Sequence, residues 1–305
     1  MIETKTQSEI LWLANRAKGI GGSDIGALLG IDKYKSPYDI WLDKTGQGVP
    51  FTGNQYTRAG KKLEKIVVEY FVEDTGAKIV QGDNEIVMSS LEGYPFALGT
   101  CDRIFKLENE TGVLECKTTQ LQIDPDDLPQ SWFCQAQWYM GVFNLPFGEI
   151  AWLERGVNFG HVRVDFNEQF FKHCLNVASK FWTDNVLANV APPAINSADV
   201  EKLYSQSDPN KTIEASEEVF DAFGELKLVR EIIKKNEQTE AEIIEQMKLV
   251  LKDAEQIKYF GNTLVSWKTS KDTNSFDLES FKKAEPAMYE KFLKIKPGAR
   301  RFLIK

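Results

Sequence analysis

The sequence predicts an α/β protein in which a central mixed sheet is flanked by helices and followed by a C-terminal helical arm. Short segments of β character alternate with longer amphipathic segments over residues 57–190, as expected when strands and helices share one sheet. The chain has 305 residues and 42% hydrophobic content, which supports an ordinary packed core. From residue 216 the apolar residues recur about every 3.5 residues, a spacing typical of a long helix.

Composition excludes several classes of protein. There is no apolar run of about 18 residues, and residues 1–8 are polar, so we expect no membrane span, no N-terminal signal and a cytoplasmic location. The four cysteines contain no CxxC pair, which favours free thiols over disulfides or a zinc knuckle. His161 and His173 are the only histidines, so a bound metal would be held by oxygen atoms and would be a hard cation.

The net charge of −8 at first argues against a nucleic-acid partner. Much of it comes from residues 214–258, which carry 12 acidic and 7 basic side chains and so contribute −5. A protein can meet DNA locally with a few cations while the rest of its surface is acidic. The charge therefore leaves a DNA partner open.

A glycine-rich loop lies between two predicted N-terminal helices. Residues 8–18 have helical apolar spacing that ends at Gly19, and residues 21–24 read GGSD. Ser23 or Asp24 can cap the next short helix, which runs to Leu29. A phosphate-binding nucleotide loop is the alternative, but this loop lacks the Walker lysine and a preceding strand. Pro37 then opens a helix over residues 38–45.

Residues 57–75 form a strongly amphipathic pattern that predicts a helix ending at Gly76. Its apolar stripe is formed by Leu63, Ile66, Val67, Tyr70 and Phe71. Glu64 lies beside this stripe, and read alone it is also compatible with a solvated helix position.

Strands follow. Residues 78–81 and 85–89 are expected to pair as a hairpin across residues 82–84, and residues 96–105 and 112–118 to continue the sheet. Residues 129–144 predict a mostly apolar helix in which Gln135 and Gln137 need polar partners, either in the core or in a polar cavity. Residues 149–153 and 160–164 predict a closing hairpin, and residues 167–190 a further helix.

The C-terminal third has a different pattern. We divide the chain into a core at residues 1–190, a linker at 191–215 and an arm with a small α/β tail at 216–305. Apolar residues along 226–257 near a 3.5-residue spacing predict one bent helix or a helical hairpin, interrupted at Asn236 and Glu240. Thr239 and Glu242 resemble a capping box. In the tail we expect a strand at 263–267 and a helix at 275–294.

The stretch over residues 99–119 carries the clearest chemistry. Period-2 alternation places Glu115 and Lys117 on one strand face, and hairpin pairing brings Asp102 to the same face. Asp102, a Glu115 oxygen and the Cys116 carbonyl can together hold Mg²⁺, and Lys117 can orient the attacking water. Taken alone, the pattern favours a surface hairpin joined by salt bridges over a catalytic site.

Several separated motifs, in order, change this weighting. They are Arg16 followed by GGSD at 21–24, GKKLE at 60–64, Asp102, ECK at 115–117, and QAQ at 135–137 with Tyr139 close behind. Over residues 10–165 the chain resembles the lambda-type exonuclease branch of the PD-(D/E)XK nucleases, the YqaJ-like viral recombinase family. The resemblance implies a restriction-endonuclease-like core.

The resemblance also implies roles. Asp102 and Glu115 would be metal ligands, Glu64 would serve a second metal or act through water, and Lys117 would be the catalytic lysine. Gln135 and Gln137 would line the site, with Tyr139 against DNA or in the core. Arg16 and Ser23 would bind a 5′ phosphate and so confer 5′ to 3′ digestion. The cofactor would be Mg²⁺, with Mn²⁺ as a substitute.

Partners follow from the same resemblance. We expect duplex DNA ends as substrate, leaving 3′ single-stranded overhangs, together with a single-strand-annealing recombinase and homo-oligomers such as a trimer, in the host cytoplasm if the chain is phage-encoded. Two alternatives stay open: an endonuclease of the same fold, and a non-catalytic module that binds DNA ends or a partner. Residues after 194 lie outside the match, and we expect an oligomerisation or partner-docking arm there, or a simple solvated helix.

Overall fold

The computed structural model describes residues 15–49, 53–82, 86–296, 298 and 300–304. The chain divides into two compact units, Met1–Tyr204 and Ser205–Lys305. The helix expected over residues 8–18 falls mostly outside the described residues, which are helical at 15 and 16.

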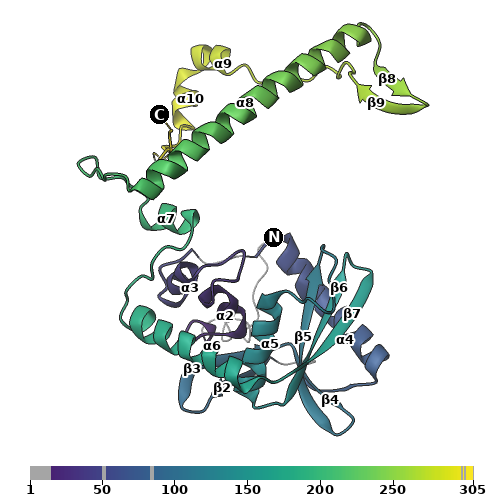
Figure 1. Cartoon of the computed structure of the whole chain (residues 1–305), viewed down its shortest axis with the longest axis vertical. Helices are drawn as coiled ribbons and strands as arrows, with labels where there is room; N and C mark the ends of the chain where they lie inside the picture. Colours follow the sequence, from purple (N-terminus) through teal and green to yellow (C-terminus); the bar gives the residue numbers. More distant parts are fainter. Residues whose placement is uncertain (1–14, 50–52, 83–85, 297, 299, 305) are drawn as a thin grey trace. The chain divides into compact units, whose positions relative to one another are not determined.

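A five-stranded mixed sheet lies at the centre of the first unit (Figure 1). In spatial order its strands are β1 (Lys78–Gln81), β4 (Arg103–Leu107), β5 (Glu110–Thr119), β6 (Phe147–Glu154) and β7 (Asn158–Asp165). Only the β5 and β6 pair is parallel; the other neighbours are antiparallel. Strand β6 is buried along its whole length, because helices cover both faces of the sheet there.

Helix α4 (Gln55–Thr75) covers one face of the sheet. Its residues Val67, Val68 and Phe71 pack in one hydrophobic cluster with Phe105 and Phe147 of the strands. The predicted stripe is partly wrong: Ile66 and Tyr70 are 39% and 42% exposed, and Val68 is buried instead. Gly76 ends the helix in the left-handed conformation, as predicted.

The opposite face is covered by α5 (Gln130–Phe143), which connects the parallel strands β5 and β6. Helices α2 (Gly22–Leu28), α3 (Pro37–Lys44) and α6 (Glu168–Phe181) contribute to the same, larger hydrophobic cluster. A parallel pair requires such a crossover connection, and this helix follows β5 after a loop over residues 120–129. The predicted α/β class, with a central mixed sheet flanked by helices, is confirmed.

Two predictions about the strands are wrong. The expected hairpin of residues 78–81 with 85–89 does not form, because β1 pairs with β4, while β2 (Val87–Leu91) pairs with β3 (Tyr94–Cys101) in a separate two-stranded sheet. Ile79 packs in the cluster under α4, whereas Val87 packs in the cluster around α5, so the two strands serve different cores. The single strand expected over residues 96–105 is divided at Asp102, where β3 ends and β4 begins.

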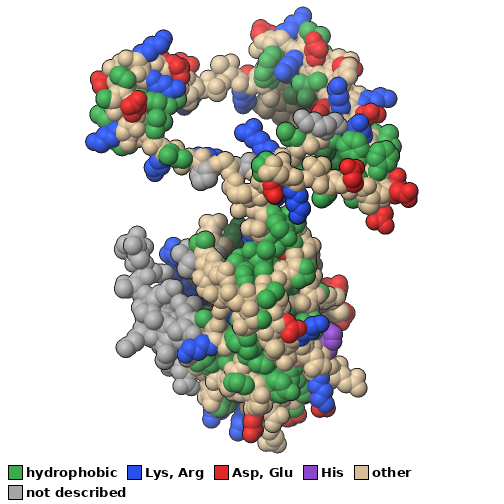
Figure 2. Space-filling view, turned by 90° about the vertical axis from the view of Figure 1, so that its left-hand side faces the viewer, with side chains coloured by type: hydrophobic (Ala, Val, Ile, Leu, Met, Phe, Trp, Pro, Cys, Tyr) green, Lys and Arg blue, Asp and Glu red, His purple; other side chains and the backbone are tan. Residues whose placement is uncertain are grey.

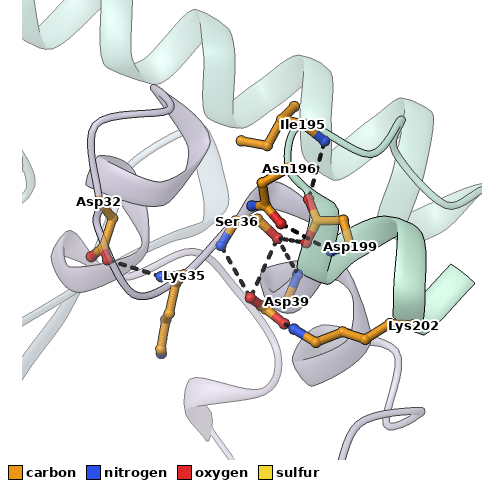
Figure 3. Close-up of polar contacts among 8 residues, drawn as sticks. All are labelled: Asp32, Lys35, Ser36, Asp39, Ile195, Asn196, Asp199 and Lys202. Atoms are coloured by element: carbon orange, nitrogen blue, oxygen red, sulfur yellow. Dashed lines mark hydrogen bonds and ion pairs between the residues drawn. The ribbon is translucent and has the colours of Figure 1, made fainter. Parts of the chain in front are cut away.

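The helix predicted over residues 167–190 is formed by α6 and a π-helical turn, η1 (Trp182–Leu187). Helix α7 (Ser197–Leu203) lies inside the stretch expected to be a linker. Figure 3 shows that its buried Asp199 accepts a hydrogen bond of 2.6 Å from Ser36, the residue that caps α3. This contact fastens α7 to the first unit.

The second unit contains one long helix. Helix α8 (Glu217–Leu251) is continuous over 35 residues, so the bent helix or helical hairpin expected there is a single helix, and Thr239 lies in its interior rather than at a cap. A hairpin of β8 (Gln256–Tyr259) and β9 (Asn262–Ser266) follows. The helix expected at 275–294 is split at Pro286 into α9 (Leu278–Ala284) and α10 (Pro286–Lys291).

Charges of both signs are mixed with hydrophobic side chains on the visible face of residues 205–305 (Figure 2). None of the helices in the described part of the chain is both long and apolar enough to cross a membrane. All four cysteines are free thiols, and three of them, Cys101, Cys134 and Cys174, are buried.

Candidate active site

Asp102 lies at the point where the chain leaves the two-stranded sheet and enters the five-stranded one. Its Oδ2 accepts a hydrogen bond of 2.7 Å from the backbone N–H of Cys116, so β5 holds the carboxylate in place. The end of β1 passes close by at Gly82, where φ is +109° and a Cβ would lie 2.4 Å from the carbonyl oxygen of Asp102. Only glycine fits there without displacing this peptide.

Glu115 and Lys117 project from one face of β5, as the two-residue period predicts. Lys117 Nζ lies 2.7 Å from Glu115 Oε1. Gln135, from the second turn of α5, completes the group: its Oε1 accepts a bond of 2.8 Å from Lys117, and its Nε2 donates one of 2.6 Å to Glu115 Oε1. A strand and the crossover helix that follows it thus supply three polar groups in mutual contact.

Tyr139 lies behind Gln135, one turn further along α5. Its hydroxyl is 3.0 Å from Gln135 Nε2, and burial raises the pKa of this phenol well above its ordinary value. Helix α2 begins directly against this ring, because a Cβ at Gly22 would lie 2.6 Å from the Tyr139 ring and 3.1 Å from Gln135. The glycine-rich loop is therefore packed against the polar group formed by Glu115, Lys117 and Gln135.

Glu64 reaches the same region from α4. Gly60, one turn earlier on this helix, lies next to Thr118 at the end of β5, where its Cβ would be 3.5 Å from the threonine hydroxyl. Glu64 Oε1 is 2.8 Å from Nη1 of the buried Arg103, and the same Nη1 donates a bond of 2.7 Å to the Asp102 carbonyl. Arg103 therefore bridges Glu64 to the backbone at Asp102.

The electrostatics of this cluster is dominated by buried carboxylates. Burial, followed by the charges of Glu115 and Glu64, raises the pKa of Asp102 well above its ordinary value. Burial likewise raises the pKa of Glu115, although Lys117 opposes this shift. Glu115 Oε2 is buried and has no hydrogen-bond partner among the described residues. The carboxylates of Asp102, Glu115 and Glu64 thus outnumber the cations that contact them, Lys117 and Arg103.

These residues fit a hard cation by their chemistry. Every candidate donor is an oxygen atom: the carboxylates of Asp102, Glu115 and Glu64, and the carbonyl of Cys116. Within the described ranges no three acidic, His or Cys side chains already surround a common point, since the carboxylates are engaged by Cys116 N–H, Lys117 and Arg103. Glu115 Oε2 is the acceptor left without a hydrogen bond, and a bound cation would satisfy it.

Arg16 and Ser23, the residues expected to bind a phosphate, are in contact. Arg16 Nη2 donates a hydrogen bond of 2.8 Å to Ser23 Oγ. Beneath them lies Asp24, which is fully buried and forms an ion pair of 2.9 Å with Lys44 of α3. Lys44 also donates a bond of 3.0 Å to the carbonyl oxygen of Arg16. Asp24 Oδ1 lies 3.7 Å from Arg16 Nη2, so the buried Asp24 holds the guanidinium while Lys44 holds the backbone of Arg16.

One expected site residue lies elsewhere. Gln137 is fully buried, its Nε2 donates to the carbonyl oxygen of Asp165 at 2.8 Å, and its Oε1 accepts from the N–H of Asn167 at 2.8 Å. Two residues further along a helix, a side chain points about 200° away, so Gln135 and Gln137 cannot share one site. Gln137 is a satisfied core amide that fixes the connection from β7 to α6.

The structure also adds two residues that the sequence patterns missed. The sequence does not indicate Lys44, because a lysine in an amphipathic helix is usually exposed. Arg103 directly follows Asp102, and a cation beside a candidate metal ligand is the one signal that could have drawn attention to it. Asp102, Glu115, Lys117 and Gln135 are brought together as expected, with Glu64 beside them.

Fold and site together define a class. An aspartate lies directly before β4, a Glu-x-Lys motif lies on the adjoining strand β5, and the helix after β5 adds a glutamine. This is the arrangement predicted for a PD-(D/E)XK-type core. The chain is 32% identical to the protein YqaJ of Bacillus subtilis (strain 168), over 96% of this chain and 93% of that protein. The YqaJ-like viral recombinase domain matches residues 11–145. The chain therefore belongs to the YqaJ-like viral recombinase family, as the sequence motifs predicted.

More distant similarities also occur. A protein of Acanthamoeba polyphaga mimivirus is 26% identical over 141 residues, which are 41% of this chain and 25% of that protein. Among solved structures, the alkaline exonuclease LHK-Exo from Laribacter hongkongensis aligns with a TM-score of 0.46 and 13% identity, over 64% of this chain and 95% of the other. A phage-related exonuclease from Haemophilus somnus 129PT gives a TM-score of 0.41 and 13% identity, over 56% and 96%.

Proposed function

We propose that this protein is a Mg²⁺-dependent nuclease that degrades one strand of duplex DNA from its 5′ end and leaves 3′ single-stranded overhangs. The observation that carries the proposal is the contact group of Glu115, Lys117 and Gln135 beside Asp102, in which one buried carboxylate oxygen has no hydrogen-bond partner in the part of the chain that the structure describes. Family membership supports it, because the family domain matches residues 11–145, a range that includes all of these residues.

Each side chain has a role that its contacts support. Asp102, Glu115 and the Cys116 carbonyl would hold Mg²⁺, with Glu64 available to a second ion. Mg²⁺, when bound, supplies positive charge beside the scissile phosphate. Lys117 uses two N–H groups on Glu115 and Gln135, which leaves its third N–H to orient the attacking water. Gln135 fixes the position of both neighbours.

Arg16 and Ser23 would bind the terminal 5′ phosphate. A guanidinium and a hydroxyl suit this ligand, because both donate hydrogen bonds to phosphate oxygens. The buried Asp24 and Lys44 fix the loop, and Asp24 Oδ1 also lies 3.7 Å from Arg16 Nη2, so a bound phosphate would share this guanidinium with Asp24. Binding of the terminal phosphate would set the polarity of digestion. The 3′ strand left behind is the substrate of an annealing recombinase, which we propose as a partner; homo-oligomers such as a trimer belong to the same proposal.

A nuclease assay on labelled linear duplex tests the activity. Wild-type protein with Mg²⁺ should release mononucleotides from 5′-phosphorylated ends and should leave closed circles intact; a chelator should stop the reaction. Lys117→Ala should lower the rate by about 10²-fold or more, as expected for loss of a group that acts on the transition state. Lys106→Ala removes an exposed lysine from the same hairpin and should leave the rate unchanged.

Other outcomes would contradict this proposal. Cleavage of closed circles would indicate an endonuclease of the same fold. Duplex-end binding without hydrolysis, equal in wild type and Lys117→Ala, would indicate a non-catalytic module. For the polarity, Arg16→Ala should reduce the preference for 5′-phosphate over 5′-hydroxyl ends about tenfold, as expected for the loss of a charge-assisted bond. Lys172→Ala on α6 is its charge-matched control, and an unchanged preference in Arg16→Ala would remove the phosphate-site claim.

A further inference from the structure

Helix α8 exposes a row of apolar side chains that the rest of the described second unit leaves uncovered. The row is Leu226, Val229, Ile233, Ile243, Met247 and Val250, whose exposed fractions range from 37% to 72%. Asn236 and Glu240 complete the spacing of alternating three and four residues. Eight positions in this register span roughly three and a half heptads, which is the pattern of a two-stranded coiled coil.

The row is symmetric about residue 238. Leu226 and Val250 lie equally far from it on either side, and the same holds for Val229 with Met247 and for Ile233 with Ile243. The two polar members, Asn236 and Glu240, are also equidistant from it. A second copy of α8, turned end for end, therefore meets the first with apolar residues opposite apolar residues and polar opposite polar in every layer.

The polar layers decide between the two orientations. In a parallel pair Glu240 faces Glu240 of the second copy, and two carboxylates are brought together in a partly buried layer, which is unfavourable. In an antiparallel pair each Glu240 faces an Asn236, whose amide N–H₂ can donate a hydrogen bond to the carboxylate. Polar core residues of this kind are known to fix register and partner number in coiled coils.

We propose that α8 binds a second copy of this chain as an antiparallel two-stranded coiled coil centred on residue 238. Its apolar layers are Leu226 with Val250, Val229 with Met247 and Ile233 with Ile243, each formed twice. The paired region is about 36 Å long at 1.5 Å per residue. The proposal does not depend on nuclease activity or on contacts between the first units.

Disulfide trapping in the full-length chain tests the pairing directly. Ile233→Cys and Ile243→Cys chains, distinguished by a mass tag, are mixed, equilibrated and oxidised, and denaturing gels without reductant show the products. We expect a two-chain product that contains one chain of each kind, and no such product from either variant alone. The native cysteines give the background, which wild-type protein measures. One disulfide joins two chains, so the result does not depend on whether the first units also associate.

A matched control uses the outer face of the same helix. Lys235→Cys and Glu242→Cys lie at nearly the same height but away from the apolar row, and their mixture should not exceed the wild-type background. Efficient self-trapping of Ile233→Cys alone would overturn the antiparallel arrangement in favour of a parallel one. Absence of the mixed product, with both chains folded by circular dichroism, would overturn self-pairing and leave the row to another partner.

A second variant gives opposite results for the two orientations. Asn236→Leu should weaken an antiparallel pair about tenfold, because each Glu240 carboxylate then faces an apolar side chain without a donor. In a parallel pair the same change replaces an Asn–Asn layer by Leu–Leu and should strengthen association. Glu240→Gln, which keeps a hydrogen-bonding layer, is the conservative companion and should change association less. Sedimentation equilibrium over a concentration series measures all three, and stronger association of Asn236→Leu would contradict the proposal.

Discussion

At the scale of single residues, Asp24 determines how the glycine-rich loop is built. Its Oδ2 accepts a bond of 3.0 Å from the N–H of Gly21 and pairs with Lys44, and both charged side chains are fully buried. Burial works to raise the pKa of Asp24, but Lys44 and Arg16 outweigh it and hold the pKa below its ordinary value. The loop that carries Ser23 therefore depends on an ion pair that no solvent can replace.

We predict that Asp24→Asn lowers the free energy of unfolding by about 3–5 kcal/mol at pH 7, because it leaves the buried Lys44 charge without its partner. Asp43→Asn is the matched control. Asp43 also lies near Lys44, at 3.7 Å, but is 57% exposed, so its loss should cost about 1 kcal/mol or less. Urea unfolding followed by fluorescence measures both variants.

The same pair has a defined dependence on pH. Because the folded-state pKa of Asp24 lies below the unfolded value, its stabilisation is fully present above the unfolded pKa, which is near 3.8, and is lost as pH falls through the folded pKa. The difference between wild type and Asp24→Asn should therefore shrink in acid. A difference that stays constant down to pH 3 would contradict this account.

The sequence predicts a site residue where a motif specifies its type and position. It does not predict the direction in which a side chain points where packing between elements determines that direction. Asp102, Glu115 and Lys117 follow from period-2 alternation, and Gln135 follows from the family motif. Gln137 was assigned to the same site, although helical geometry sends it to the opposite side of α5. Lys44 could not be found, since nothing in the sequence shows that α3 packs against the loop bearing Asp24.

At the scale of elements, α7 is attached to α3 by polar contacts. Asp199 is fully buried; its Oδ1 accepts from the Ser36 hydroxyl and its Oδ2 from the N–H of Ile195 at 3.1 Å (Figure 3). Lys202 of the same helix forms an exposed ion pair with Asp39. A stretch rich in turn residues thus acquires a helix because one carboxylate satisfies groups from two elements.

We predict that Asp199→Ala lowers the free energy of unfolding of the first unit by about 1–3 kcal/mol, because the Ile195 N–H loses its acceptor and the Ser36 hydroxyl keeps only its longer bond of 3.3 Å to Asp39. Lys202→Ala, which removes only the exposed pair, should cost less than about 1 kcal/mol. Thermal melts and proteolysis near residue 200 report the two effects. Equal losses in both variants would mean that the buried hydrogen bonds contribute little.

Elements were predictable in kind but less so in pairing. Helices α3, α4, α5 and the strands β6 and β7 lie within a few residues of their predicted positions, because each has a clear period and a cap or a turn. The adjacency of strands β1 and β2 in sequence predicts, wrongly, that they pair with each other. Each strand pairs according to the hydrophobic cluster in which its side chains pack. The local spacing of apolar residues does not show which cluster that is.

At the scale of the whole molecule, the first unit has hydrophobic clusters to which the second unit adds no residue. Both large hydrophobic clusters consist of residues up to 203, so we predict that residues 1–204 fold alone and retain the nuclease activity of the full chain. Circular dichroism and the linear-duplex assay test this fragment against full-length protein at equal molar concentration. A folded fragment without activity would show that the second unit takes part in the reaction itself.

The segment that runs through β3 into β4 connects the two ends of the proposed site. Ile20 forms backbone hydrogen bonds of 2.7 and 2.8 Å with Phe96 and Leu98 of β3, and Gly19 beside it has no room for a Cβ, which would lie 2.2 Å from the Phe96 oxygen. Eight residues after Tyr94, the same segment delivers Asp102. If Arg16 and Ser23 hold the terminal phosphate of the DNA, this backbone sets a fixed distance between the phosphate site and Asp102. The DNA strand is then cut at a constant distance from its 5′ end, so every cut releases a product of the same length whatever the base sequence.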